Sequence, residues 1–72
     1  MQRFGEKLRF LRKQRGMTLK ELALELGFAT HSYLSKVETG KKMPTGQLIL
    51  DASRFFNVSS DQLIKDELEL DD

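Results

Sequence analysis

Residues 18–40, with the sequence TLKELALELGFATHSYLSKVETG, contain two short helical patterns separated by a turn. Thr18 and Glu21 have the spacing of a capping box, in which each residue's side chain accepts a hydrogen bond from the other's amide. The first helix then continues to Gly27 along one apolar face, which is formed by Leu22, Ala23 and Leu26. The pattern therefore predicts a helix that starts at a defined cap and ends at a glycine turn.

The second pattern follows the turn and has only two strong apolar positions. Thr30 can cap a helix that runs from His31 to about Glu38, and Leu34 and Val37 form its inner face. Its outer face carries side chains that donate and accept hydrogen bonds, namely His31, Ser32, Ser35 and Lys36. Side chains of this kind read base edges in a DNA major groove, which is about 12 Å wide.

A further helix is expected before this unit, from about Phe4 to Arg15, with Gly16 as its C-terminal cap. One apolar stripe runs along it, formed by Phe4, Leu8 and Leu11.

Two more helices are expected after the unit. One starts at Pro44-Thr45, and its predicted stripe consists of Ile49, Ala52 or Ser53, and Phe56. A second capping box, Ser59 with Gln62, opens a last helix around Leu63-Ile64. Because no segment alternates long enough for a strand, the chain is predicted to be all-α, with five short helices in one compact domain.

The composition limits the possible classes of protein. Seventy-two residues suffice for one small domain, and the absence of cysteine excludes disulfides and thiolate metal sites. No apolar run approaches the roughly 20 residues of a membrane span, and the first residues lack the apolar core of a signal peptide. We therefore expect a cytoplasmic protein that does not associate with membranes.

The charge is distributed unevenly. Residues 1–65 carry all 12 Lys and Arg residues but only 6 of the 11 acidic residues, an excess of six positive charges. Residues 66–72 carry the other five acids and no base. This division predicts a basic domain over 1–65, with its helix-turn-helix unit at about 18–38, followed by an acidic C-terminal tail over 66–72. A basic body suits a polyanion, although a solvated charged surface explains the same charges.

The chain lacks the side-chain combinations that enzymes use. His31 is the only histidine and has no cysteine partner, so a metal site is not expected. His31 and Ser32 are neighbours on a helix and point about 100° apart, which does not suit a base and its nucleophile. The glycines stand singly, so no phosphate-binding loop is present. We expect no catalytic residues, no cofactor and no enzymatic activity.

Over residues 4 to about 65 the sequence resembles the phage lambda-repressor/Cro-like helix-turn-helix transcriptional regulators, which include the xenobiotic-response-element type. The matching positions are Phe4, Gly5, Glu6, Lys7, Leu8, Arg9, Leu11, Arg12, Gly16, Met17, Thr18, Glu21, Leu22, Ala23, Gly27, Ser35, Lys36, Val37, Glu38, Thr39, Gly40, Pro44, Val58, Ser59 and Leu63. The resemblance implies sequence-specific binding of double-stranded DNA, with helix 31–38 in the major groove, by a regulator that represses transcription.

The resemblance also implies a role for individual residues. The expected base-contacting residues are His31, Ser32 and Lys36, followed by Tyr33 and Ser35. The expected phosphate-contacting residues are Thr18, Lys20, Thr30, Gly40, Lys41 and Lys42, several of them near helix N-termini, which favour anions. Arg12 and Glu38 are expected to form a structural ion pair.

The sequence departs from the family pattern at two places. Leu19 occupies the first position of the second helix, where the family usually has a DNA-contacting glutamine. We interpret it as an exposed helix-start residue, and the alternative is an apolar contact to a thymine methyl or a sugar. The turn Gly27-Phe28-Ala29 is one residue longer than usual. The spacing of Leu34, Val37 and Glu38 indicates that the turn, not the helix, accommodates the extra residue.

The last expectations concern assembly. Phe55, Val58 and Ile64 are predicted to form a homodimer patch, because a symmetric dimer places two recognition helices one turn of a palindromic operator apart. The acidic tail is expected to be a mobile flank. The alternative is a protein-interaction module, such as an antitoxin or anti-regulator, that inserts Leu68 and Leu70 into a protein partner.

Overall fold

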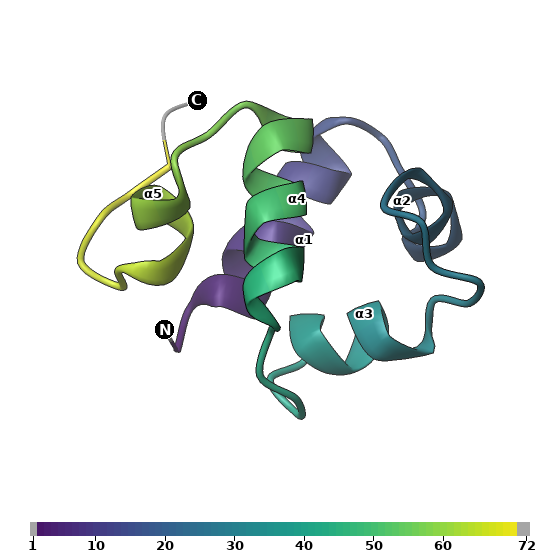
Figure 1. The fold of residues 1–72 in the computed structure, drawn as a ribbon. Coiled ribbons are helices and arrows are strands. Elements are labelled where there is room, and N and C mark those ends of the chain that lie inside the picture. The colour runs from purple at the N-terminus through teal and green to yellow at the C-terminus, as the bar shows by residue number, and fades with distance from the viewer. Residues whose placement is uncertain (1, 71–72) are drawn as a thin grey trace.

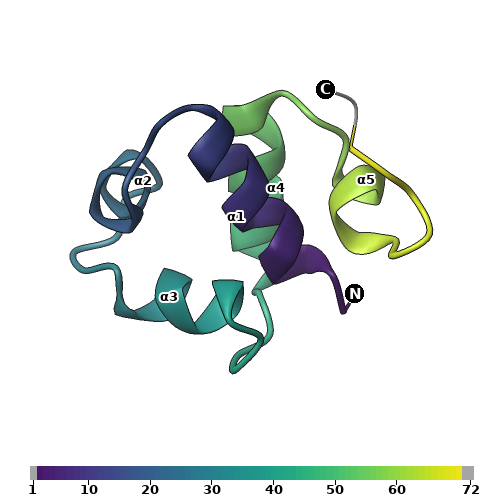
Figure 2. The same cartoon turned by 180° about the vertical axis from the view of Figure 1, so that it is seen from behind.

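The computed structural model describes residues 2–70, which form five helices and no strand. In chain order these are α1 (Phe4–Gln14), α2 (Leu19–Glu25), α3 (Ser32–Glu38), α4 (Gly46–Phe56) and α5 (Ser60–Ile64). Helices α1 and α4 occupy the middle of the molecule, α2 and α5 lie on opposite flanks, and α3 lies along one edge next to α2 (Figures 1 and 2). The prediction of an all-α fold with five short helices is confirmed.

The local capping signals form as the sequence predicts. The Glu21 amide donates to the Thr18 hydroxyl at 3.1 Å, and the Thr18 amide donates to the Glu21 carboxylate at 2.8 Å. Ser59 and Gln62 form the second box with bonds of 3.0 and 3.1 Å. Each box provides acceptors for amides that the first turn of a helix leaves unpaired, so it fixes where the helix begins.

One predicted cap is wrong. Helix α3 begins at Ser32 rather than at His31, and Thr30 does not cap it. The backbone carbonyl of His31 accepts the first helical hydrogen bond, from the Ser35 amide at 2.9 Å, so His31 is the residue that precedes the helix. No side chain caps this helix start.

The predicted stripe of α4 is also partly wrong. The side chains that it buries are Leu48, Ala52 and Phe56, whereas Ile49 and Ser53 are only half-buried. The Thr45 hydroxyl caps the helix by accepting from the Leu48 amide at 3.1 Å. Leu48, Ala52 and Phe56 are spaced four residues apart, so they lie on the same face of the helix, and this face packs against the core.

The five helices share one core. The buried apolar side chains are Phe4, Leu8, Leu11, Leu22, Ala23, Leu34, Val37, Leu48, Ala52, Phe56 and Leu63. The predicted stripes of α1 and of the helix-turn-helix unit are among them, except for Leu26, which is half-buried against the core.

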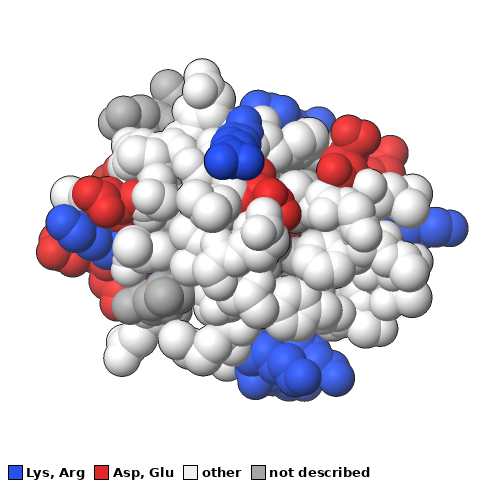
Figure 3. All heavy atoms as spheres, in the orientation of Figure 1, with Lys and Arg blue, Asp and Glu red and all other residues white. Residues whose placement is uncertain are grey.

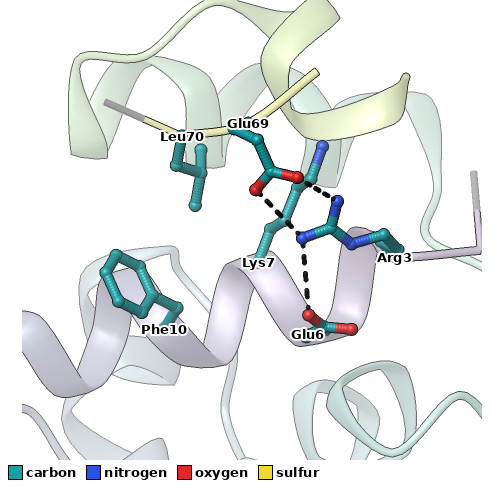
Figure 4. A pocket seen from close by; sticks show the side chains of 6 residues that line it. All are labelled: Arg3, Glu6, Lys7, Phe10, Glu69 and Leu70. Carbon is teal, nitrogen blue, oxygen red and sulfur yellow. Dashed lines mark hydrogen bonds and ion pairs between the residues drawn. The ribbon is translucent and has the colours of Figure 1, made fainter. Parts of the chain in front are cut away.

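Residues 66–70 pack against α1 instead of forming the mobile flank that we expected. The Asp66 carboxylate accepts from the Gln2 amide at 3.0 Å and from the Arg3 amide at 2.9 Å, and it therefore caps the start of α1. Arg3 also forms an ion pair with Glu69 at 2.9 Å (Figure 4). Leu70 packs against the core, so it is not free to insert into a protein partner in the way that the alternative function requires.

The Asp66 cap responds to pH in a defined direction. The hydrogen bond from the Arg3 amide is the main cause of a lowered pKa of the Asp66 carboxyl. A carboxyl whose pKa is lowered in the folded state stabilises the fold above the unfolded pKa, and this contribution is lost as the pH falls through the folded value. The attachment of residues 66–70 to α1 therefore weakens in acid.

Lys7 strengthens the same attachment from the interior. Its side chain is almost fully buried, and its Nζ donates to the carbonyls of Gln62, Lys65 and Leu68 at 2.6, 2.8 and 2.6 Å. These carbonyls lie in the last turn of α5 or after it. The C-terminal end of a helix carries a partial negative charge, which favours a cation there. Three donors meet three acceptors, so the buried ammonium group is fully hydrogen-bonded.

Candidate nucleic-acid interface

Helix α3 separates an inner from an outer face. Leu34 and Val37 are buried, whereas His31, Ser32 and Lys36 are exposed. This is the register predicted from the sequence, so the longer turn does not rotate the helix. The Phe28 amide donates to the Ala23 carbonyl at 2.8 Å, which closes the C-terminal end of α2.

A glycine in α1 lets α1 and α3 approach closely. Gly5 is buried, and a Cβ atom added to it would lie 2.1 Å from the Val37 carbonyl oxygen and 3.0 Å from that of Glu38. No side chain fits between these backbones. This role of Gly5 was not predicted from the sequence, although a glycine inside a helical pattern indicates a close packing contact.

The ion pair between Arg12 and Glu38 holds the same end of α3. Arg12 Nε donates to Glu38 Oε2 at 2.8 Å, and Arg12 Nη2 donates to Glu38 Oε1 at 3.1 Å. The two side chains are only 10% and 4% exposed. Arg12 Nη1 donates to the Met17 carbonyl at 2.7 Å. One guanidinium group therefore connects α1, the segment before α2 and the end of α3.

Two of the predicted base-contacting residues are less accessible than expected. Ser35 is half-buried. Tyr33 is half-buried too, and its hydroxyl donates to the Met43 carbonyl at 3.1 Å and accepts from the Thr45 amide at 3.0 Å. The hydroxyl hydrogen of Tyr33 is thus already used in a bond to the loop that follows α3.

The loop between α3 and α4 presents two cations beside the outer face of α3. Lys41 and Lys42 are exposed, and a group of Lys and Arg side chains projects at the lower edge of the molecule where this loop lies (Figure 3). Gly40 has a left-handed backbone with φ of 79°, and its amide donates to the Val37 carbonyl at 3.1 Å. Because this amide is the only donor of Gly40, its predicted phosphate contact would compete with the bond that ends α3.

The remaining predicted phosphate-contacting residues are Thr18, Lys20 and Thr30, and all are exposed. At the start of α2 the Thr18 amide already donates to Glu21, and this bond is the main cause of a lowered pKa of the Glu21 carboxyl. Leu19 is half-buried and packs against the core, so its interpretation as an exposed residue is wrong.

The described residues contain no helix that is both long and apolar enough to cross a membrane. All five helices contribute side chains to the shared core.

Comparisons with known proteins agree with this arrangement. A helix-turn-helix family model matches residues 8–63. YazB of Bacillus subtilis (strain 168), named as an uncharacterized HTH-type transcriptional regulator, is 34% identical over 64 residues, which cover 89% of this chain and 91% of that protein. The HTH-type transcriptional activator BcrR of Enterococcus faecalis is 36% identical over 64 residues, which cover 89% of this chain and 31% of that protein. The chain belongs to the lambda-repressor/Cro-like helix-turn-helix family of transcriptional regulators.

Proposed function

We propose that this regulator binds double-stranded DNA sequence-specifically with α3 in the major groove. The observation that carries the proposal is the division of α3 into a buried inner face and an exposed outer face with His31, Ser32 and Lys36. The ammonium group of Lys36 can donate to the O6 and N7 atoms of guanine, and the Ser32 hydroxyl can both donate and accept. His31 lies at the start of the helix, the end that enters the groove most deeply in this class of protein.

The phosphate contacts that we propose flank this helix. Lys41 and Lys42 follow its C-terminal end, and Thr30 precedes it. On α2, Lys20 and Thr18 are exposed. Such contacts fix the orientation of the protein on the duplex without carrying sequence information.

Replacing Lys41 or Lys42 by alanine is expected to change the salt dependence of DNA binding. Each lost phosphate contact should reduce the slope of log affinity against log salt by about one unit, with little change in sequence preference. Fluorescence anisotropy of a labelled duplex across a range of salt concentrations measures the slope.

Lys65→Ala is the matched control, because Lys65 is an exposed lysine at the end of α5, on the flank away from α2 and α3. The control should leave the slope unchanged. DNA binding that does not depend on salt, or no binding at low salt, contradicts the proposed function.

We further propose that the protein acts as a homodimer on a palindromic operator, since one seven-residue recognition helix reads only a few base pairs. Phe55, Val58 and Ile64 are half-buried against the core, so part of each remains available to a second copy. Phe55 packs edge-on against Phe56, with ring centroids 5.0 Å apart, and Arg15 lies 4.9 Å from its ring.

Phe55→Glu is expected to prevent dimer formation on operator DNA, because it places a charge in the proposed apolar contact. Analytical ultracentrifugation with and without operator measures the assembly. Leu50→Glu is the control, because Leu50 is an exposed apolar residue of α4 outside the patch. Unchanged dimerisation of a folded Phe55→Glu protein leaves the patch without a role.

Occupancy of an operator that overlaps a promoter is sufficient for repression, and this is the mode that we propose. The protein would act in the cytoplasm, without a cofactor and without enzymatic activity. The interaction-module alternative has less support, since Leu70, one of the two leucines that it would insert, packs against the protein's own core, whereas Leu68 is exposed.

A further inference from the structure

The loop between α3 and α4 is attached to α3 at both of its ends. At its start, the amides of Lys41 and Lys42 donate to the Lys36 carbonyl at 2.8 and 3.3 Å. At its far end, the Tyr33 hydroxyl binds the Met43 carbonyl at 3.1 Å and the Thr45 amide at 3.0 Å. The two attachment points on α3 are three residues apart, so one short stretch of the recognition helix fixes the whole loop.

Tyr33 itself is held in place. Its ring lies 5.7 Å from that of Phe28 in the preceding turn, measured between centroids. Thr45, which the hydroxyl binds, is also the capping residue of α4 through its bond with the Leu48 amide. A single side chain therefore links the turn before α3, the helix and the residue that caps α4.

We propose that Tyr33 is a positioning residue for phosphate binding, which acts through the loop lysines and does not itself contact a base. This inference rests on the proposed DNA binding. An ordered loop holds Lys41 and Lys42 beside α3 before DNA arrives, so less conformational freedom is lost when the duplex binds. Without the two hydroxyl bonds, the loop would be attached to α3 only through the amides of Lys41 and Lys42.

A double-mutant cycle tests this role. Tyr33→Phe removes the hydroxyl and keeps the ring against Phe28. In the native background it should weaken binding to random-sequence DNA about two- to tenfold, because ordering the freed end of the loop on the DNA then costs free energy. In a Lys41→Ala/Lys42→Ala background the same substitution should have no further effect, because the groups that it positions are gone.

Ser53→Ala is the matched control, because the hydroxyl of Ser53 on α4 also holds a turn. It donates to the carbonyl of Val58, in the turn after α4, at 2.5 Å. It should lower the melting temperature and leave DNA affinity unchanged in both backgrounds. If Tyr33→Phe weakens binding equally with and without the lysines, Tyr33 contacts DNA directly or acts through overall stability, and the inference is wrong. If Tyr33→Phe leaves binding unchanged in the native background, the inference is also wrong. If the native protein shows no salt-dependent binding, the proposed function itself fails.

Discussion

Replacing Gly5 by alanine is expected to lower the free energy of unfolding by about 3 kcal/mol or more, at the upper end of overpacking effects. The added Cβ would lie 2.1 Å from the Val37 carbonyl oxygen, which belongs to the backbone and cannot rotate away. Either α1 or the end of α3 must shift, so the recognition helix should lose its position and DNA affinity should fall as well. Urea denaturation followed by circular dichroism measures the stability.

Gly46→Ala is the control for this prediction. Gly46 is the first residue of α4, and a Cβ atom added there meets nothing within 4 Å. Alanine should therefore be neutral or stabilising by about 0.4–1 kcal/mol, because it restricts the unfolded chain. If Gly5→Ala and Gly46→Ala are equally stable, the close approach of α1 and α3 is not required for the fold.

Arg12→Ala is expected to destabilise the protein by about 3–5 kcal/mol, the usual cost of removing one partner of a buried ion pair. The substitution leaves the Glu38 carboxylate, only 4% exposed, without its cation, and it leaves the Met17 carbonyl without a donor. The Glu38 carboxylate holds the end of α3 against α1, and the Met17 carbonyl holds the segment before α2. DNA affinity should therefore fall together with stability, and a stabilising substitution elsewhere should recover part of it.

Arg9→Ala provides the comparison, because Arg9 is an exposed arginine of the same helix and its loss should change stability by less than about 0.5 kcal/mol. Thermal denaturation and DNA titration of both variants measure the two effects. An Arg12→Ala protein as stable as Arg9→Ala would show that the ion pair does not hold α3.

The features that residue spacing predicted correctly depend on residues close together in the chain, whereas the Arg12–Glu38 pair was expected from the family resemblance. The capping boxes at Thr18 and Ser59 involve residues three positions apart, and the spacing of Leu34 and Val37 is enough to orient α3. Even here, one position was wrong. The predicted stripe of α4 contained Ile49 in place of Leu48, whereas Ala52 and Phe56 are buried as predicted.

The features that the sequence could not predict depend on segments far apart in the chain. Asp66 caps a helix 63 residues earlier, and Lys7 binds carbonyls more than 50 residues later. The local sequence pattern of an acidic C-terminal segment does not show whether the segment packs against the domain or forms a free tail. The free tail was predicted from charge alone. The hydrogen bonds of Lys7 to three backbone carbonyls can be identified only when the packing of the helices is known.

The assignment of site residues was limited in another way. Tyr33 and Gly40 have the right chemistry and lie in the right segment, but their donors already bind Met43 and Val37. Sequence reasoning identifies which groups can donate, whereas the structure shows which donors are still available.

The most direct test of the proposed interface compares Lys36→Ala with the native protein on two duplexes. One is an operator selected in vitro from random sequences, and the other is random DNA of the same length. If α3 reads bases in the register described, the substitution should cost about 1–3 kcal/mol of binding free energy on the operator and far less on random DNA. Equal losses on both duplexes would show that Lys36 contacts phosphate, and would contradict the assignment of this face of α3 to base recognition.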